Sequence, residues 1–535
     1  MAMMGNLGTA AVALASLLGT VMSWSAIEQS PSVDIAFGSV KGNWLAGGNV
    51  REFVGVPFAT AERFQIAKDW NAAYANGGVL DARQFGPICP QPNMLPGFTD
   101  YAEDCLVLNI WTPAQARSGS LPVMYFIHGG SFVHGTGNLY NGSVVAEKHN
   151  AVVVSINYRL ASFGFFAPRG GITNFGLRDQ QSGLRWVREH IEHFGGDPAK
   201  VMIYGESAGA MSVQMQALIP SSHGLFSSML SESGFPSTRP LDYAISTSES
   251  FAQEVGCMNQ TSNADDVLSC MKTVPLEAML KSENARSGNP FTNPGWSPVT
   301  DYDLFPANAL KILLTGAFNA TGMLNWVVGS NTDEGTMFVY PEFKLGMNAT
   351  QYRTFMKSVV DGHGATPLTA SMWKSFYTLY PPSETKDNRA LASAVFGDAT
   401  FICGSRFYLR NLQRKGLTRT WNYHFDYLRD PACYPKAPKD WKVSHASELP
   451  YSFDQPLMDS STCGRFTPAG EHLAETMGSY WEQFASGADD GWSKWNSTAE
   501  ANIVFTRSGA TATEFKRRAE YCDFWETTFK YRSND

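Results

Sequence analysis

The chain has 535 residues, of which 44% are hydrophobic and 17% are charged, so it is long enough to bury a large core. Its formal net charge is −8, which argues against nucleic acid as a partner. No cluster of lysine and arginine indicates binding to phosphate or to a membrane surface. Length alone would suggest about three domains, but the motifs described below are spread over most of the chain.

The N-terminal segment is typical of a secretory signal. Residues 1–27 contain no charged side chain, and residues 7–22 form an apolar stretch that is short for a membrane span. We predict a signal peptide over residues 1–25, and the alternatives are an uncleaved anchor or a disordered leader. The C-terminal residues 530–535 are polar and resemble neither a retention signal nor the tail of a lipid anchor.

Two further features favour secretion. Eight cysteines occur without a C-x-x-C pair or a Cys/His metal spacing, which favours disulfides over zinc. Five N-x-S/T sequons are candidate glycosylation sites: Asn141, Asn259, Asn319, Asn348 and Asn496. We therefore expect a secreted, disulfide-bonded glycoprotein.

Short apolar runs recur along the chain and predict strands that are buried on both faces. A helix is expected over 179–194, because Leu184, Val187 and Ile191 fall on one helical face. The alternation of strands and helices predicts right-handed crossovers and a mostly parallel α/β sheet covered by helices. The expected strands are 53–58, 106–111, 123–127, 152–156, 201–204, 228–230, 326–328 and 421–425.

A G-x-S-x-G motif occupies residues 205–209, directly after the strand expected over 201–204. A helix is expected over 210–219, so the motif lies in a strand–turn–helix context, which is that of a nucleophile elbow. The glycines allow the tight turn, because a Cβ at either position would clash. The motif predicts that Ser207 is the nucleophile of an acyl-transfer reaction.

A serine nucleophile needs a base and a carboxylate, which follow in the order serine, acid, histidine in this type of fold. The best acid segment is 329–335, where Asp333 and Glu334 compete and spacing does not decide between them. The best base is His445. A structural role is expected for His190 and His193 on the predicted helix, whereas two others, His128 and His134, flank a glycine loop.

That glycine loop, residues 128–132, follows the strand expected over 123–127. Adjacent glycines allow backbone amides to point into one concavity, as in an oxyanion hole completed by the amide of Ala208. Each such donor contributes about 3–4 kcal/mol to transition-state stabilisation. Phe132 is a candidate wall of the substrate pocket, with inward packing as the alternative.

Together these segments resemble the type-B carboxylesterases, a family that contains carboxylesterases, cholinesterases and fungal lipases. The resemblance is carried by residues 103–111, 175–180, 194–198, 205–210, 329–335 and 445–451. It implies one α/β-hydrolase domain over 26–535, with a mostly parallel sheet covered by helices on both faces.

The resemblance also implies residue roles, and it implies neither a metal nor an organic cofactor. The implied triad is Ser207, Glu334 and His445, with Glu334 chosen because the family's carboxylate immediately precedes a glycine. The implied oxyanion donors are Gly130, Ser131 and Ala208, and the residues near the histidine are Glu206 and Ser233. The implied disulfides are Cys89–Cys105, Cys257–Cys270 and Cys403–Cys522, with Cys433–Cys463 left over.

Two departures from the family pattern bear on the substrate. Ser131 stands where the family usually has a third glycine. Only 15 residues lie between Cys89 and Cys105, and they include no tryptophan that could hold choline by a cation–π contact. This loop is also short and partly polar for a lipase flap. It therefore favours esters that are soluble or of short-to-medium chain length.

We thus predict a secreted serine ester hydrolase that acts on a small-molecule ester through an acyl-enzyme. The alternatives are a lipase or sterol esterase of the same family, an amidase or lactonase, and a non-catalytic adhesion or binding member. No nucleic acid and no stable membrane anchor are expected as partners. The sequence does not predict the oligomeric state.

Overall fold

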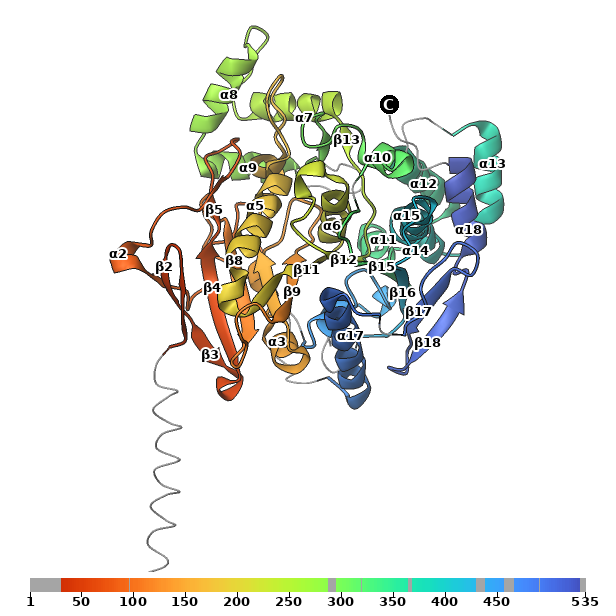
Figure 1. Ribbon diagram of the computed structural model, residues 1–535. Coiled ribbons are helices and arrows are strands. Elements are labelled where there is room, and N and C mark those ends of the chain that lie inside the picture. Colours follow the sequence, from red (N-terminus) through yellow and green to blue (C-terminus); the bar gives the residue numbers. More distant parts are fainter. Residues whose placement is uncertain are drawn as a thin grey trace, which may run out of the picture.

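The computed structural model describes residues 30–95, 97–286, 295–318, 320–363, 368–429, 438–456, 466–489 and 491–529. The predicted signal peptide, Asn319, Cys433 and Cys463 lie outside these residues. The N-terminal strands form one edge of a large sheet and the C-terminal strands form the other edge (Figure 1).

This sheet has eleven strands. Its centre is parallel, from β10 through β9, β11, β12, β15 and β16 to β17, and antiparallel strands flank it on both sides. In spatial order the strands are β18 (Thr511–Phe515), β17 (Ala501–Phe505), β16 (Thr420–Phe425), β15 (Asn325–Asn331), β12 (Ser228–Glu232), β11 (Gly196–Glu206), β9 (Leu121–Ile127), β10 (Val152–Ile156), β8 (Val107–Pro113), β4 (Val50–Pro57) and β3 (Asn43–Leu45).

All eight expected apolar runs lie in strands of this sheet. The strands β3, β17 and β18 were not predicted. Another sheet, formed by β1 (Ser32–Ile35), β2 (Gly38–Lys41) and β7 (Val79–Asp81), was not predicted either. The prediction of a mostly parallel sheet is therefore confirmed. The strands at its two edges, β3 on one side and β17 and β18 on the other, were not predicted from the sequence.

Strand β9 shows why helices cover both faces. Val123, Tyr125 and Ile127 contribute to one apolar core and Met124 and Phe126 to another, because alternate side chains of a strand point to opposite faces. Helices α5 (Phe175–His190) and α6 (Ala208–Leu218) supply side chains to the first core. Helices α3 (Ser143–His149) and α17 (Pro468–Ser486) supply side chains to the second core.

The helix expected over 179–194 begins four residues earlier, and its last four residues form a 3₁₀ turn instead of an α-helix. It consists of α5 followed by the 3₁₀ turn η3 (Ile191–Phe194). Gly195 follows with φ of 102°, a left-handed conformation that a glycine adopts without strain. The glycine turns the chain into β11, which leads to the Ser207 elbow.

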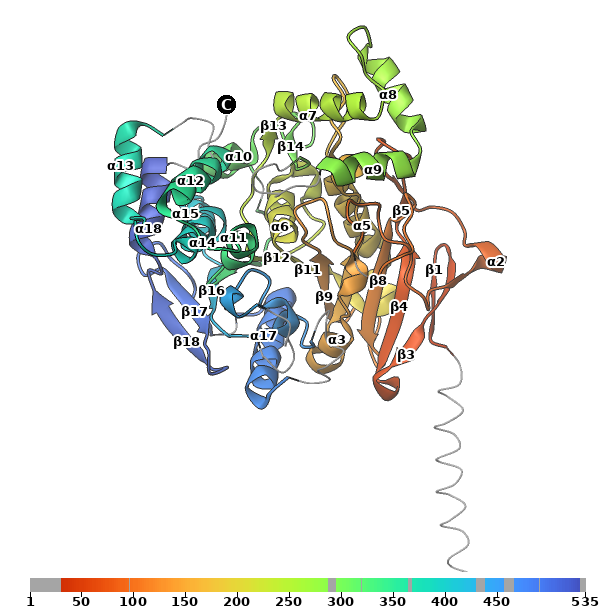
Figure 2. The same cartoon turned by 180° about the vertical axis from the view of Figure 1, so that it is seen from behind.

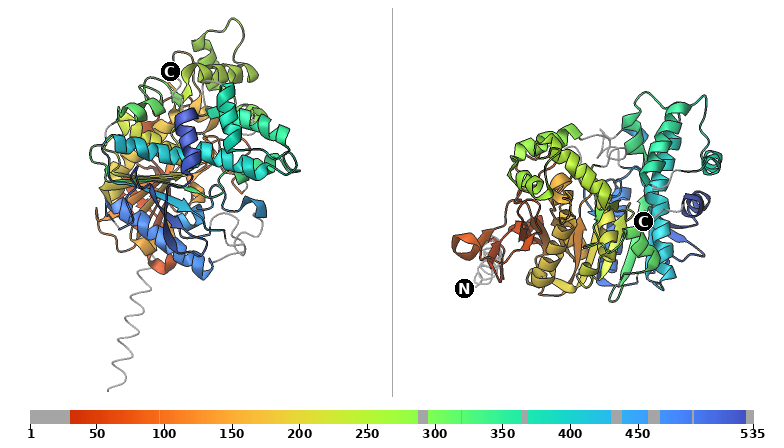
Figure 3. Two further views of the ribbon diagram at one scale, coloured as in Figure 1. Left: turned by 90° about the vertical axis from the view of Figure 1, so that its right-hand side faces the viewer. Right: turned by 90° about the horizontal axis from the view of Figure 1, so that it is seen from above.

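A helical segment projects beyond the sheet at the top of Figures 1 and 2 and in the left view of Figure 3. It comprises α7 (Leu241–Glu254), α8 (Ala264–Thr273) and α9 (Leu276–Arg286). The Cys257–Cys270 disulfide ties the chain after α7 to α8. No helix among the described ranges is long and apolar enough to cross a membrane.

The structure contains three disulfides, which are the pairs that the family resemblance implied. Cys89–Cys105 and Cys257–Cys270 close short loops, whereas Cys403–Cys522 joins residues that are 119 positions apart. Every cysteine in the described part of the chain is paired. The remaining pair, Cys433–Cys463, stays a prediction.

Candidate active site

Ser207 lies at the tip of a sharp turn between β11 and α6. Its φ of 57° and ψ of −122° are strained for a residue with a side chain. A Cβ at Gly205 or at Gly209 would overlap the carbonyl oxygen of Ile127, at the end of the neighbouring strand. The sequence predicted that the two glycines are needed for the tight turn, and the structure shows that they also allow the elbow to pack against β9.

His445 and Glu334 lie side by side in the buried interior. Nδ1 of His445 is 2.7 Å from Oε2 of Glu334. The other carboxylate oxygen, Oε1, accepts hydrogen bonds of 2.6 Å from the Ser233 hydroxyl and from the Asn331 amide. Three donors thus hold the carboxylate in place, and the imidazole is oriented through its Nδ1 atom.

The structure also separates the two competing carboxylates. Asp333 accepts a hydrogen bond of 3.3 Å from the Val443 amide, and its other oxygen lies 3.9 Å from Nζ of Lys442. Glu334 is 1% exposed and contacts the histidine. Of the two candidates, Glu334 has the geometry of the orienting acid.

Two phenylalanine rings pack on the imidazole of His445. The ring of Phe401 stacks on it with a centroid distance of 4.4 Å and an interplanar angle of 27°. Phe338, in α11 (Thr336–Glu342), approaches with a centroid distance of 5.2 Å. Phe401 belongs to the π-helix η5 (Asp398–Ile402), a type of helix that is frequent at functional sites. Sequence reasoning missed both residues, since neither contact shows in a local motif.

The second imidazole nitrogen faces another carboxylate. Nε2 of His445 lies 3.0 Å from Oε1 of Glu206, but the contact is not aligned as a hydrogen bond. Within the described residues Nε2 has no well-aligned hydrogen-bond partner, Ser207 included. Burial opposes protonation of His445, but attraction by Glu206 and Glu334 outweighs it and raises its pKa well above the usual value.

We expect the Glu206→Gln substitution to move the acid limb of the kcat/KM profile to lower pH by about 1 pH unit or more. If His445 is the base, its neutral imidazole is the active form, so kcat/KM is expected to rise as the pH passes the pKa of His445. Removal of the Glu206 charge lowers that pKa. The measurement is the pH profile of ester hydrolysis. Glu189→Gln, an exposed glutamate 3.8 Å from His190, is the matched control, and an acid limb that stays in place would contradict the expectation.

The glycine loop after β9 packs directly on the elbow. A Cβ at Gly129 would lie 2.7 Å from the carbonyl oxygen of Glu206 and 3.0 Å from Cβ of Ser207. Gly130, Ser131 and Phe132 follow with φ values of 105°, 57° and 63°. Successive residues in the left-handed conformation keep their backbone amides out of helix and sheet hydrogen bonds and can direct them into one concavity.

The candidate oxyanion donors keep their amides available. The amides of Gly130, Ser131 and Ala208 donate no hydrogen bond to any residue that the structure describes. The carbonyl group of Gly130, by contrast, accepts bonds from the amides of Val133 and His134. The carbonyl group of Gly130 thus closes a turn at the end of the loop. The amides of Gly130 and Ser131, which have no partner in the described residues, directly follow Gly129, which packs on the elbow.

Gln91 joins the Cys89–Cys105 loop to Gly135, three residues beyond the glycine loop. Its Oε1 accepts from the Gly135 amide at 2.9 Å, and its Nε2 donates to the carbonyl groups of Gly135 and Cys89 at 3.0 Å. The Cys89–Cys105 loop is fixed elsewhere as well, because the Tyr101 hydroxyl donates to Glu277 of α9 at 2.8 Å. The loop that would be the flap of a lipase is thus held near both of its ends, by the disulfide and by the bonds of Gln91 and Tyr101.

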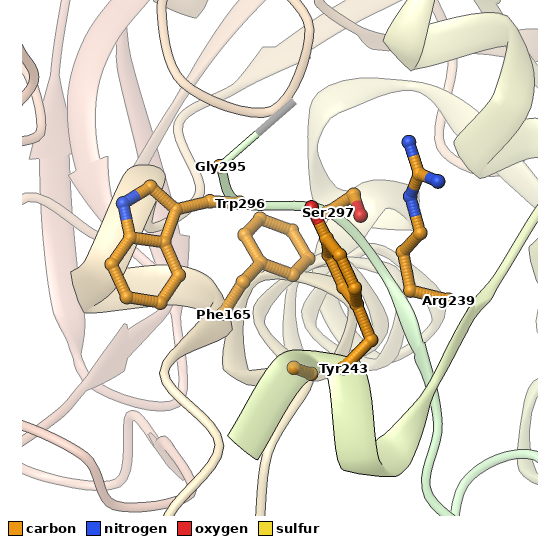
Figure 4. A pocket seen from close by; sticks show the side chains of 7 residues that line it. Phe165, Arg239, Tyr243, Gly295, Trp296 and Ser297 are labelled. Atoms are coloured by element: carbon orange, nitrogen blue, oxygen red, sulfur yellow. The ribbon is translucent and has the colours of Figure 1, made fainter. Parts of the chain in front are cut away.

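Phe132 packs inward and is 2% exposed. Its ring meets that of Phe165 edge-on, with a centroid distance of 5.3 Å. Phe165 in turn lines a small cavity together with Tyr243, Trp296 and Arg239 (Figure 4). The guanidinium group of Arg239 lies 5.5 Å from the centre of the Tyr243 ring. Phe132 therefore connects the oxyanion loop to this aromatic cluster.

Four of the five sequons lie in the described part of the chain. Asn259, Asn348 and Asn496 are exposed, and Asn141 is half-buried. The Oδ1 atom of each accepts a hydrogen bond from a backbone amide two or three residues further along the chain. These positions stay candidate glycosylation sites.

Comparisons with known proteins place the chain in a family. The sequence matches the Carboxylesterase family over residues 29–525. It is 31% identical to the para-nitrobenzyl esterase of Bacillus subtilis (strain 168), over 85% of this chain and 89% of that protein. It is 28% identical to the bile salt-activated lipase of Mus musculus, over 91% of this chain and 84% of that protein. It is 30% identical to neuroligin-2 of Mus musculus, over 86% of this chain and 61% of neuroligin-2.

Among solved structures, a PNB esterase matches with a TM-score of 0.77 at 28% sequence identity, over 93% of this chain and all of that one. This similarity confirms the predicted α/β-hydrolase fold. The similarity to esterases extends over nearly the whole chain, and the Ser207 elbow lies within it. The protein is therefore a member of the carboxylesterase family and a carboxylic ester hydrolase.

Proposed function

We propose that the protein is a secreted serine esterase that uses a Ser207–His445–Glu334 triad and acts on soluble esters of short-to-medium chain length. The observation that carries the proposal is the 2.7 Å contact between Nδ1 of His445 and Glu334, beside a serine held in a strained elbow. The carboxylate holds the proton on Nδ1, which leaves Nε2 as the base.

In the proposed reaction, Nε2 of His445 takes the proton from Oγ of Ser207 as Oγ attacks the ester carbonyl carbon. The amides of Gly130, Ser131 and Ala208 stabilise the oxyanion. His445 then protonates the leaving alcohol, and an acyl-enzyme remains on Ser207. Water, activated by the same nitrogen, releases the acid and restores the serine.

The substrate range rests on the Cys89–Cys105 loop. The loop is bound through Gln91 to Gly135, just beyond the oxyanion loop, and through Tyr101 to α9. Arg63 also holds it, with a bond of 2.8 Å from Nε to Glu103. A flap that opens at a lipid surface has to give up such bonds, so these contacts favour a soluble substrate. The similarity to bile salt-activated lipase makes a lipase the second candidate.

Secretion and domain organisation belong to the same proposal. Three disulfides and exposed sequons favour an oxidising compartment. One sheet contains strands from residue 43 to residue 515, which supports a single hydrolase domain over 26–535.

Two measurements test the proposal together. A fluorophosphonate probe is expected to label one residue per chain, Ser207, and to leave Ser207→Ala unlabelled. Hydrolysis of p-nitrophenyl esters from acetate to palmitate is expected to be fastest with the short and medium chains. Labelling that persists in Ser207→Ala would refute the nucleophile, and a palmitate optimum with emulsified substrate would favour the lipase.

A further inference from the structure

Glu232 lies beside the nucleophile elbow, although no step of the proposed reaction uses it. It stands opposite Glu206 in the pairing of β12 with β11, and its carbonyl group accepts a hydrogen bond of 3.0 Å from the Ser207 amide. Its side chain is fully buried. Oε1 accepts a bond of 2.8 Å from the Ser452 hydroxyl, which itself accepts one of 2.9 Å from Nε1 of Trp481. Glu232 thus connects the elbow to α16 (Leu449–Ser452) and α17.

Glu448 is a second buried glutamate, at the start of the same short helix α16. Its Oε2 accepts a hydrogen bond from the Asn331 side chain, and its carbonyl group accepts one of 2.9 Å from the Ser452 amide. Ser452 therefore bonds both glutamates, Glu448 through its amide and Glu232 through its hydroxyl. The Glu232 side chain reaches Ser452 of α16 from β12, whereas the Glu448 side chain reaches Asn331 at the end of β15.

One oxygen of each of these two glutamates has no donor. Oε2 of Glu232 and Oε1 of Glu448 are buried without a hydrogen-bond partner in the described residues. Burying an ionised carboxylate with an unpaired oxygen costs more free energy than burying a neutral carboxylic acid, because no hydrogen bond replaces its lost hydration. A single proton on the pair removes one charge and supplies one donor.

The charges around Glu232 and Glu448 also favour a protonated pair. Among the described residues, the titratable groups that interact with one or both of these glutamates include Glu206, Glu334, Tyr140, Tyr204 and Tyr423. Arg517 is a cation that interacts with Glu334, and it donates to Ser330 and to the carbonyl group of Asn331 rather than to either glutamate. Burial, with repulsion from Glu448, raises the pKa of Glu232 well above its usual value. Burial, with repulsion from Glu206 and Glu334, raises the pKa of Glu448 to about 8.

We propose that Glu232 is a positioning residue, and that it and Glu448 hold one proton between them. The protonated pair keeps β12 and the His445 loop together and limits the negative charge near the imidazole. Loss of the proton in alkaline solution leaves two buried carboxylates that repel each other, so the elbow and the base move apart. The kinetic part of this inference rests on the proposed function.

The kinetic test compares Glu232→Gln with Glu232→Ala. Glutamine mimics the protonated acid permanently, because its oxygen accepts from Ser452 and its amide group is a donor. We expect kcat/KM of Glu232→Gln at pH 7 to stay within about threefold of the parent. We expect the parent to lose activity above about pH 8 and the Gln variant to keep it, while Glu232→Ala loses at least about tenfold at every pH. An alkaline fall that is identical in parent and Glu232→Gln would overturn the proposal.

A second test needs no catalysis, so its outcome is independent of the proposed function. Both proteins carry Ser207→Ala, and Tm is measured from pH 6 to pH 9 with and without Glu232→Gln. A group whose pKa is raised on folding binds more protons in the folded state, so its contribution to stability is lost as the pH rises. We expect the Tm of the parent to fall relative to that of the Gln variant by roughly 1–3 °C per pH unit. Parallel curves would overturn the shared proton, even if ester hydrolysis is present.

Discussion

Glu334→Gln is expected to lower kcat by about 10⁴-fold while the protein stays folded. Glutamine keeps an oxygen that accepts the bonds of Ser233 and Asn331, each 2.6 Å long. Its amide group then faces Nδ1 of His445, which becomes an acceptor. The proton moves to Nε2, and that nitrogen no longer takes the proton of Ser207. The measurement is steady-state hydrolysis of p-nitrophenyl butyrate, with circular dichroism as the check on folding.

Asp333→Asn is the matched control for this prediction. Asp333 is the adjacent carboxylate, but it contacts Val443 and Lys442 rather than the histidine. Its loss is expected to change kcat by less than about threefold. If Asp333→Asn were the inactive variant and Glu334→Gln the active one, the assignment of the acid would be reversed. If both kept full activity, the triad itself would be wrong.

The double variant Cys403→Ala/Cys522→Ala is expected to lose about 4–5 kcal/mol of unfolding free energy, because its disulfide closes a loop across 119 positions. Both cysteines are fully buried. Cys403 begins α15 (Cys403–Arg414) directly after the π-helix that carries Phe401. We therefore expect Tm to fall by roughly 5–10 °C and activity to fall together with it. Thermal unfolding and residual hydrolysis after heating measure the two effects.

Cys257→Ala/Cys270→Ala supplies the comparison. This bridge spans 13 positions and lies in the projecting segment of α7 to α9, away from the histidine. Its removal is expected to cost about 3 kcal/mol or less, mostly as local opening. An equal loss of hydrolysis in the two double variants would show that the long bridge has no special connection to the site.

Much of the fold could be predicted because the central strands carry continuous apolar runs. Val123 to Ile127 is buried on both faces, so its sequence has no polar interruption. The edge strands carry no such signal. β18, Thr511–Phe515, has four exposed residues out of five and reads as a loop. β17 has only a short apolar run, and its place in the sheet comes from pairing with β16.

The site was predictable where local chemistry marks it and not where tertiary packing creates it. The glycines around Ser207 and the order of the motifs indicated a candidate nucleophile and a candidate base. Spacing did not choose between Asp333 and Glu334, because only the direction of each side chain decides which one reaches His445. Phe401 lies 44 residues before His445, and a π-helix has no recognisable periodicity in the sequence. The family resemblance did place Glu206 near the histidine, but the 3.0 Å separation from Nε2 depends on how β11 meets the histidine loop.

The two-sided burial of β9 limits how this chain can change in length. One inserted residue within Leu121–Ile127 would exchange the side chains of the two cores and would shift the oxyanion loop that follows the strand. Two inserted residues would restore the faces but still displace the loop from Ser207. The segment from α7 to α9 projects from the sheet and carries none of the proposed catalytic residues. Insertions and loop grafts that retain activity are therefore expected there, and libraries that vary β9 are expected to yield mostly unfolded protein.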